Sequence, residues 1–419
     1  MRDLFIFAVV FGGLPFILRR PWIGFVYWVW LSVMNPHRLS WGMAYDFPFA
    51  QLVALATLAG LVFTKDPREF KGGAAAFALL LFLLHTCLTT YTALVPHEAS
   101  IMLVRVLKIQ LFTFLGLVVL HKREHLIWVV WMIVLSIGYY AIKGGIFTIA
   151  TAGAFRVWGP ADSFIADNNA LALATVMTIP LWSYLYIYYK NQRWRGLFLV
   201  AIALSAFSAL GSQSRGALLA IGGMAIYLWL KGRRKLLVGI ALAMAAITLA
   251  NFMPQSWKDR MNTIGTYKSD ESAMGRIETW HMLFDIAVDR PLVGGGFEPY
   301  SREVLARYRP DYTTVRAAHS VYFQVLGEHG FMGLALFLIF WLLTLRMALR
   351  IVRATKNRPD LEWASWLARM IQVSFLAYFI GGAFLNLAYW DVPYYLMVIL
   401  AVTWRIVRHT PQPAAQTTH

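Results

Sequence analysis

The chain has 419 residues, of which 59% are hydrophobic and only 14% are charged, and its formal net charge is +17 at pH 7. Its apolar residues come in runs of about 15 to 25, longer than the core helices of soluble proteins, so soluble classes are excluded and an all-α, polytopic integral membrane protein is predicted. Many of its cations lie between these runs, so we predict contacts with membrane lipids and none with nucleic acid.

The predicted transmembrane helices follow from the apolar runs, judged against the ~20 residues that a span needs. The first run is short, and because Arg19-Arg20 follows it without a small-residue cleavage site, we expect it to be retained and not removed as a signal peptide. We predict about twelve spans, give or take one. The runs fall at about 4–18, 22–36, 48–63, 73–94, 100–121, 125–142, 169–188, 196–211, 217–230, 236–252, 320–345, 364–388 and 392–407.

Short connections rich in lysine and arginine separate several of the runs, which is the pattern of loops that face the cytoplasm. They contain Lys65, Arg68 and Lys71; Lys122 and Arg123; Lys190, Arg193 and Arg195; Lys231, Arg233, Arg234 and Lys235; and Arg346, Arg350, Arg353, Lys356 and Arg358. With these connections inside, the long loops 143–168 and 253–319 face outward and the C-terminus lies in the cytoplasm.

The chain is therefore predicted to have four parts. Residues 1–252 form the first part of a transmembrane bundle, 253–319 form a large outer loop that contains helices, 320–408 complete the bundle, and 409–419 form a disordered cytoplasmic tail. Long loops on a rigid scaffold are where binding and catalytic residues concentrate, so we expect function in the outer loops.

The longer outer loop is predicted to contain an amphipathic helix over 270–289, with Asp270 or Ser272 as its N-cap. Side chains recur on this helix at i, i+4 and i+8, namely Arg276, Trp280 and Phe284. The segment Pro291–Gly296, which ends in three glycines, is predicted to stop the helix.

His319 is the first candidate for chemistry, because it lies where the polar loop meets the apolar run 320–345 and its imidazole titrates near neutral pH. If the segment is helical, steps of about 100° per residue bring Gly330 and Gly333 back near the His319 face and leave that face open to a substrate. The alternative is a histidine at a helix start with two glycines that only permit close packing.

Arg215 is the second candidate, because it lies in the short outward break Gly211–Gly216 against the positive-inside bias. A guanidinium there can grip phosphate oxygens bidentately, and the neighbouring glycine and serine residues let backbone donors approach the same anion. The alternative is an interfacial arginine that reaches toward lipid headgroups.

Further outward arginines lie near glycines or aromatic residues, and we rank Arg276 above Arg156 and Arg290 among them. Each of them could instead pair with a carboxylate of the loop, and a surface pair of that kind contributes only about 0–1 kcal/mol. The sequence contains no Walker A, HExxH or G-x-S-x-G motif and no outer Asp-x-Asp. We therefore expect no cofactor and no metal, and any energy source must come with the substrate.

His319-Ser320, nine further residues, and then Gly330-Phe331-Met332-Gly333 resemble the H-[NSQ]-x9-G-x-x-[GTY] motif of the bacterial O-antigen ligase family. Gly275–Trp280 and Pro291–Gly296 resemble the rest of that superfamily's signature, and the likeness covers roughly 160–400. The first 150 residues are similar to the ligase-like proteins found beside exosortase systems.

The resemblance implies a GT-C type glycosyltransferase of the bacterial inner membrane with its active site facing the periplasm. It moves a polysaccharide from undecaprenyl pyrophosphate to an acceptor, with inversion at the anomeric carbon and without metal. By position, Arg215 and Arg276 match the family's essential arginines, which we expect to bind the pyrophosphate, His319 matches its essential histidine, and Asp391 matches a later outer acidic residue. His329 departs from the commonest pattern, and we expect its replacement to be nearly silent.

The expected reaction is that of an O-antigen ligase with a sugar hydroxyl of lipid A–core as the acceptor. An O-antigen polymerase or a protein O-oligosaccharyltransferase of the same superfamily differs only in the acceptor. A lipid-linked oligosaccharide flippase is the alternative from another class, and inward-facing basic residues buried among the spans would favour it. The candidates instead gather on one outer face, which favours catalysis.

Overall fold

The computed structural model describes residues 1–70, 72–231, 271–312 and 314–411, and short pieces at 239–240, 244, 251, 253–255 and 257–258. These residues form helices and connections, without a strand among them, so the all-α expectation is confirmed for the described part of the chain. Most of the apolar run 236–252, the side chains of Asp270 and Ser272, and the tail beyond Pro411 lie outside the described residues.

Each apolar run that lies wholly within the described residues forms a helix. The first helices are α1 (Arg2–Arg19), α2 (Pro21–Met34), η1 (Pro36–Leu39), α3 (Phe49–Phe63), α4 (Gly73–Tyr91), α5 (Pro96–Val119), α6 (Arg123–Ala150), α7 (Asn168–Tyr188), η2 (Arg193–Arg195), α8 (Gly196–Gly211) and α9 (Arg215–Lys231). The others are α12 (Glu271–Asp289), α13 (Arg302–Tyr308), α14 (Val321–Ala354), η4 (Pro359–Leu361), α15 (Glu362–Gly382) and α16 (Asp391–His409). Because α6 continues to Ala150, the first long loop is shorter than expected and begins at Thr151.

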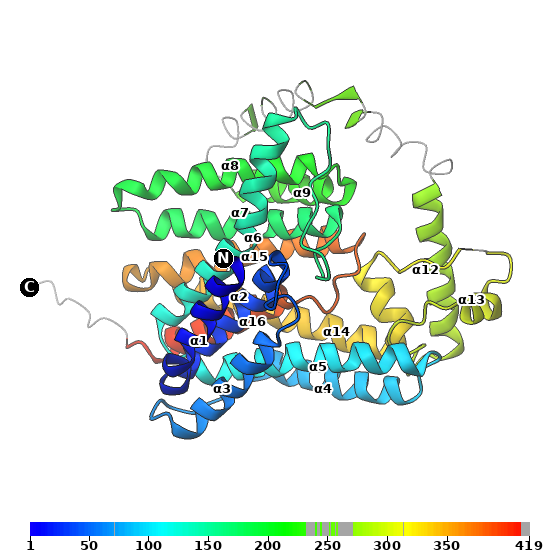
Figure 1. The fold of residues 1–419 in the computed structure, drawn as a ribbon, viewed down its shortest axis with the longest axis horizontal. Coiled ribbons are helices and arrows are strands. Elements are labelled where there is room, and N and C mark those ends of the chain that lie inside the picture. Colours follow the sequence, from blue (N-terminus) through cyan, green and yellow to red (C-terminus); the bar gives the residue numbers. More distant parts are fainter. Residues whose placement is uncertain are drawn as a thin grey trace, which may run out of the picture.

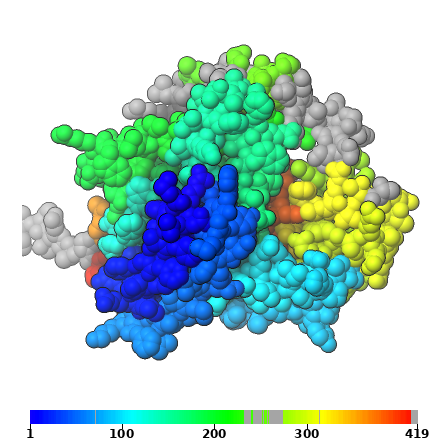
Figure 2. All heavy atoms as spheres, in the orientation of Figure 1, coloured from blue at the N-terminus to red at the C-terminus, as the bar shows by residue number. Residues whose placement is uncertain are grey.

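The long helices lie side by side as a bundle, and α12 and α13 pack at one end of it (Figure 1). We call this end of the bundle the α12 end. Figure 2 shows the residues of α12 and α13 as a yellow mass beside the cyan ends of α4 and α5. The amphipathic helix is confirmed, and α12 ends at Asp289, two residues before Pro291, as predicted.

The core of the bundle is built around α7 and α16. Residues 391–403 of α16 and 170–178 of α7 are buried without interruption. A helix that is apolar on all of its faces is stable only when other helices surround it, which explains the central position of both. The tyrosines of α16 are part of this core, and Tyr395 accepts a hydrogen bond of 2.8 Å from the indole of Trp28 in α2.

The chain is a multi-pass membrane protein. Six of the described helices are long and apolar enough to cross a membrane, namely α4, α5, α6, α7, the stretch Arg193–Gly211 and α14. Two shorter helices, α2 and α3, are also apolar. The larger number of spans that we expected from the runs stays a prediction.

The basic connections among the described residues meet at the end of the bundle opposite α12. Arg405 near the end of α16 pairs with Glu69 in the connection before α4. Lys190 lies 3.4 Å from Glu362 at the start of α15, and Arg358 donates to the carbonyl of Pro411 at 2.8 Å. Cationic connections that are far apart in the chain are thus gathered on one side, as the positive-inside pattern predicts.

The long helix α14 is broken at Gly330, where φ is 68° and ψ is −173°. The break leaves the carbonyls of Gly327 and Glu328 without helical partners, and the amides of Gly295 and Gly296 donate to them at 2.8 Å each. Pro291 accepts from the amide of Phe331 at 2.8 Å. The triple-glycine segment therefore replaces the hydrogen bonds that the kink removes.

This geometry overturns the expectation that Gly330 and Gly333 keep the His319 face open. His319 lies before α14, outside the helix, and a Cβ on Gly330 would meet the carbonyl oxygen of Pro291 at 2.5 Å. A Cβ on Gly333 would meet that of His329 at 2.2 Å. Both glycines serve close packing, which was the alternative that the sequence left open.

Candidate functional site

His319 is held in a conformation that a side chain rarely adopts. Its φ is +46°, and Ser320, which follows it, is the N-cap of α14 and accepts from the amide of Phe323 at 3.5 Å. A left-handed backbone costs a residue with a Cβ about 1–2 kcal/mol, so the surroundings must fix it. Strain of this kind gathers at functional sites, which supports a chemical role for the imidazole.

Helix α12 supplies that constraint. The indole nitrogen of Trp280 donates to the carbonyl of Ala318 at 2.6 Å, one residue before His319. The same indole stacks on Phe323 in the first turn of α14, with ring centroids 4.9 Å apart and planes 4° from parallel. Trp280 thus fixes the backbone on both sides of His319, and Arg276 lies one turn earlier on α12.

The side chain of His319 is half-buried, and it lines a cavity of about 480 Å³. The cavity lies among the loop before α7, the loop between α15 and α16, and helices α5 and α14. Its lining comprises Met102, Arg105, Asp162, Ser163, Phe164, Asp167, Ala170, Glu298, His319, Gln324, Leu385, Asn386 and Leu387. Asp167 is the N-cap of α7, where its carboxylate accepts from the amides of Asn169 and Ala170 at 2.8 and 3.1 Å.

The two arginines favoured by the sequence come together beside this cavity. Arg215 is the first residue of α9, and Ser214 caps that helix by accepting from the amide of Ala217 at 3.2 Å. Arg215 and Arg276 line one small recess, which meets the His319 cavity at Leu385. Residues from three separate segments therefore converge on one place at the α12 end.

The electrostatics around His319 favour the neutral imidazole. Burial lowers its pKa below the usual value of 6.5, the positive charges of Arg276 and then Arg316 lower it further, and the carboxylate of Asp167 opposes them. At neutral pH the ring can therefore accept a proton. Gly275 lets Arg316 approach, because a Cβ there would lie 2.7 Å from the guanidinium carbon.

The other residues that the sequence raised lie elsewhere. Arg156 is exposed, and its guanidinium faces the side-chain oxygen of Gln213 at 3.4 Å. Arg290 donates to the carbonyl of Thr92 after α4 and so fastens the loop to the bundle. Asp391 is buried at the start of α16, accepts from the hydroxyl of Tyr395 at 2.9 Å, and lines a neighbouring cavity.

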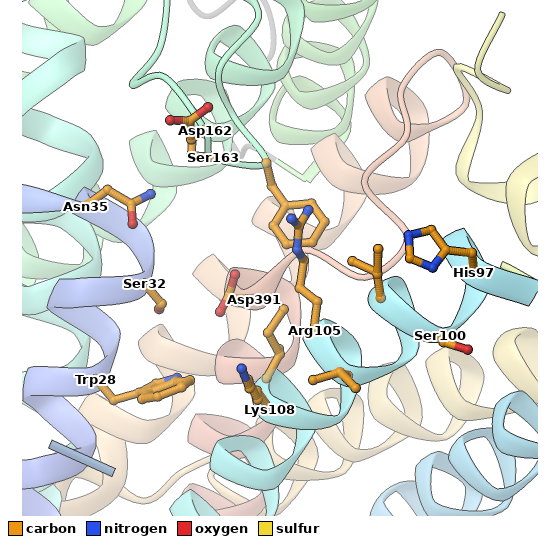
Figure 3. A pocket seen from close by; sticks show the side chains of 14 residues that line it. Trp28, Ser32, Asn35, His97, Ser100, Arg105, Lys108, Asp162, Ser163 and Asp391 are labelled. Carbon is orange, nitrogen blue, oxygen red and sulfur yellow. The ribbon is translucent and has the colours of Figure 1, made fainter. Parts of the chain in front are cut away.

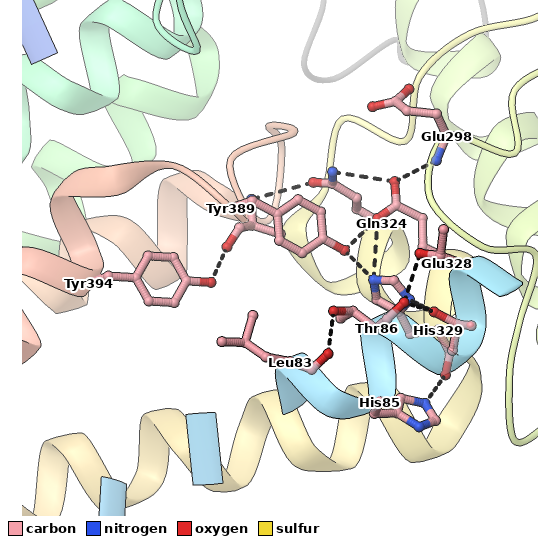
Figure 4. A network of polar contacts seen from close by, with 12 residues as sticks. Leu83, His85, Thr86, Glu298, Gln324, Glu328, His329, Tyr389 and Tyr394 are labelled. Carbon is pink, nitrogen blue, oxygen red and sulfur yellow. Dashed lines mark hydrogen bonds and ion pairs between the residues drawn. The ribbon is translucent and has the colours of Figure 1, made fainter. Parts of the chain in front are cut away.

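A buried polar network in α14 was not predicted from the sequence (Figure 4). Glu328 and His329 are fully buried, and the hydroxyl of Tyr389 lies 2.5 Å from the Glu328 carboxylate and 2.8 Å from Nε2 of His329. Thr89 of α4 lies 2.7 Å from Nδ1 of the same imidazole. A glutamate inside an apolar run was the available signal, because ionisable residues at membrane depth are rare and usually paired.

This network touches the lining of the His319 cavity. The side-chain nitrogen of Gln324 donates to Glu328 at 3.5 Å, and its oxygen accepts from the amide of Ala388 at 3.4 Å. The amide of Glu298 donates to Glu328 at 3.4 Å. Gln324 and Glu298 both line the cavity, so the network fixes the walls around His319. The expectation that replacing His329 is nearly silent does not fit its complete burial and its hydrogen bonds.

Metal ligands are a separate question. The described residues contain no group of three or more His, Cys, Asp or Glu side chains placed to hold a metal ion. The expectation of a metal-free reaction stays a prediction, to be tested on the protein in solution.

Two family models match the chain. Residues 199–338, which contain Arg215, Arg276 and His319, match the model described as O-antigen ligase. Residues 1–190 match the model of a family of unknown function. No curated protein matches the chain. The two matches meet in the bundle, because Arg105 and Asp167 of the first segment line the same cavity as His319 of the second.

Proposed function

We propose that the chain, whose residues 199–338 match the O-antigen ligase family model, is a glycosyltransferase of the bacterial inner membrane. It transfers a polysaccharide from undecaprenyl pyrophosphate to a sugar hydroxyl of lipid A–core. The reaction takes place at the α12 end, which faces the periplasm, and it proceeds with inversion and without metal.

One observation carries the proposal: His319 lines a cavity that adjoins the recess of Arg215 and Arg276. A proton acceptor and two guanidinium groups are the parts that a transfer from a lipid diphosphate requires. The neutral state of the imidazole, favoured by burial and by Arg276, suits a general base.

The proposed step follows from these positions. The acceptor hydroxyl oxygen attacks the anomeric carbon, and its proton goes to His319. The bond between the anomeric carbon and the pyrophosphate oxygen breaks, and its electron pair leaves with the pyrophosphate. Arg215 and Arg276 stabilise the negative charge that grows on this leaving group, which is the part that a metal ion plays in other enzymes. The proton then passes to solvent.

The acceptor distinguishes this enzyme from its nearest alternatives. An O-antigen polymerase would use the growing glycan and a protein O-oligosaccharyltransferase would use a peptide hydroxyl, with the same residues at the donor. The half-buried positions of His319, Arg215 and Arg276 at one end of the bundle favour transfer over lipid flipping.

The decisive experiment gives the purified full-length protein one donor and three acceptors. Undecaprenyl-pyrophosphate glycan is incubated with lipid A–core, with a serine-containing peptide, or with free glycan, and the products are separated by mass. We expect product with lipid A–core that needs His319. Product only with peptide or only with glycan would reassign the acceptor, and no product with any of them would refute the proposal.

A further inference from the structure

A second and larger cavity, of about 780 Å³, adjoins the one that contains His319 (Figure 3). The two share Arg105, Asp162, Ser163 and Phe164 as lining residues. The second cavity lies between α2 and α5, with the loop before α7 over it and the start of α16 below. Apart from Asp391, its lining comes from the segment matched to the family of unknown function.

Helix α5 presents one continuous stripe to this cavity. The stripe consists of His97, Ser100, Ile101, Val104, Arg105 and Lys108, with the spacing of three and four residues that marks one helix face. At about 1.5 Å per residue, Arg105 and Lys108 lie roughly 14 and 18 Å along the helix from Pro96. Two cations thus lie about midway along a helix that is long and apolar enough to cross the membrane.

Neither cation forms an ion pair within 4.0 Å with a described carboxylate, although the charge of Arg105 acts on Glu298, where it opposes the rise in pKa that burial causes. Arg105 lies with its guanidinium 5.9 Å from the ring centroid of Phe164, and the ion pairs among the described residues include neither Arg105 nor Lys108. The carboxylates of the cavity are engaged otherwise. Asp162 accepts from Tyr45 at 3.5 Å and lies 4.0 Å from Arg38, and Asp391 accepts from Tyr395.

The second cavity continues into a third, of about 540 Å³, through the shared side chains of Trp28 and Lys108. The walls of this third cavity are largely apolar and include Ala54, Leu55 and Leu111. A ligand that follows the three cavities would therefore meet an imidazole first, two cations next and an apolar groove last. This order of side chains is complementary to a glycolipid that has a sugar hydroxyl, a phosphate and an acyl chain.

We propose that the second cavity binds the acceptor, an anionic glycolipid whose phosphate is held by Arg105 and Lys108. The inference rests on the proposed function and names the substrate class of its acceptor side. In an inverting displacement, the attacking oxygen and the leaving group lie on opposite sides of the anomeric carbon. With the pyrophosphate at Arg215 and Arg276, the acceptor enters from the other neighbour of the His319 cavity, which is this one.

The test measures equilibrium binding to the full-length protein in phosphatidylcholine nanodiscs. The probes are lipid A with its phosphates, the same lipid A after enzymatic removal of the phosphates, phosphatidylglycerol and undecaprenyl pyrophosphate. We expect phosphorylated lipid A to bind tightest of the non-donor lipids. Because each charged hydrogen bond contributes about 1.5–3 kcal/mol, the variant Arg105→Gln/Lys108→Gln should lose tenfold or more of this affinity.

Lys143→Gln is the matched control. Lys143 is an exposed cation within the spanning helix α6, and it lines none of the three cavities. Its replacement should leave lipid A binding unchanged, and the double variant should still bind undecaprenyl pyrophosphate as the wild type does. Retained donor binding also shows that the double variant is folded.

Several results would overturn the inference. If dephosphorylated lipid A binds as tightly as the phosphorylated form, the cavity does not recognise the phosphate. If phosphatidylglycerol binds equally tightly, Arg105 and Lys108 only contact ordinary membrane lipids. Parallel loss of undecaprenyl pyrophosphate would assign the cavity to the donor. None of these outcomes contradicts the proposed glycan transfer. If lipid A binding depends on Arg105 and Lys108 but no glycan is transferred, the proposed function is refuted and the binding site is not.

Discussion

His319 and His329 are ten residues apart in one motif, yet the structure gives them opposite surroundings. His319 is half-buried on left-handed backbone, faces a cavity, and lies near Arg276 and Asp167. His329 is fully buried in α14, where both of its ring nitrogens have hydroxyl partners. The first imidazole can exchange a proton with a ligand, whereas the second holds α14 against α4 and against the loop before α16.

The difference shows that the spacing of residues in a motif does not tell which histidine takes part in the reaction and which one stabilises the fold. Both histidines are polar groups beside an apolar run, and only the packing of α4 and of the loop before α16 against α14 distinguishes them. A pair of substitutions should therefore separate catalysis from stability, with His319 affecting turnover and His329 affecting folding.

The largest expected effect is that of His319→Ala and His319→Gln on glycan transfer. Loss of a general base typically costs about 10²–10⁴-fold in rate, and glutamine cannot accept the proton at neutral pH. Binding of undecaprenyl pyrophosphate should survive, because the arginines hold it. Transfer and donor binding are measured for both variants at equal membrane abundance. A His319→Gln enzyme with near wild-type turnover would show that this histidine positions the acceptor without taking its proton.

Arg215→Lys tests the donor side of the same site. An ammonium keeps the charge but cannot reproduce the bidentate grip on a diphosphate, so we expect donor binding and transfer to fall by about 10- to 100-fold. Donor affinity and transfer rate are measured for this variant and the wild type, with Lys143→Gln as a control that should match the wild type. If lysine performs like arginine, the residue acts as a point charge or as a lipid anchor.

The three loop-borne candidates could be chosen from the sequence, because each of them stands out locally. Arg215 is an outward arginine in a break between apolar runs, Arg276 lies on an amphipathic helix, and His319 opens a motif. The structure places them around adjoining spaces at one end of the bundle. Their roles stay predictions, but their proximity could be expected from the order of loops and helices.

The sequence did not reveal the sites that form between helices. The cavity of Arg105 and Lys108 exists because α2 lies opposite α5, and no local pattern states which helices are neighbours. The kink at Gly330 was missed for the same reason, since the segment that satisfies it lies more than thirty residues earlier, at Gly295 and Gly296. A helical pattern in α14 continues through the break and conceals it.

His329→Ala should destabilise the protein more than it alters the chemistry. Alanine would leave the hydroxyls of Thr89 and Tyr389 without their partner, and each unsatisfied buried group costs about 1–3 kcal/mol. Thermal unfolding in detergent should show a lowered midpoint, while the transfer rate per folded molecule changes far less than in His319→Ala. Unchanged stability would contradict the assigned scaffolding role.

The pH dependence of transfer should carry the signature of His319. Burial and Arg276 lower the pKa of this imidazole, so it is neutral above that pKa, and the rate should fall only as pH drops below 6.5. Arg316→Gln removes one of the charges that lower the pKa and should move the midpoint of the acid limb upward. A midpoint above 6.5 in the wild type, or a downward shift in Arg316→Gln, would contradict this electrostatic account.

The smallest expected effect is that of chelation, which should leave transfer unchanged. The charge that develops on the pyrophosphate can be met by Arg215 and Arg276, whose guanidinium groups donate several hydrogen bonds to phosphate oxygens and need no metal to do so. Transfer is measured in EDTA and after addition of Mg²⁺ or Mn²⁺, with Arg215→Lys in parallel. If EDTA abolishes turnover and a divalent ion restores it, a metal ion stabilises the leaving pyrophosphate together with the arginines. If chelation affects only Arg215→Lys, the metal compensates for a weakened guanidinium grip, and the wild-type enzyme relies on its arginines alone.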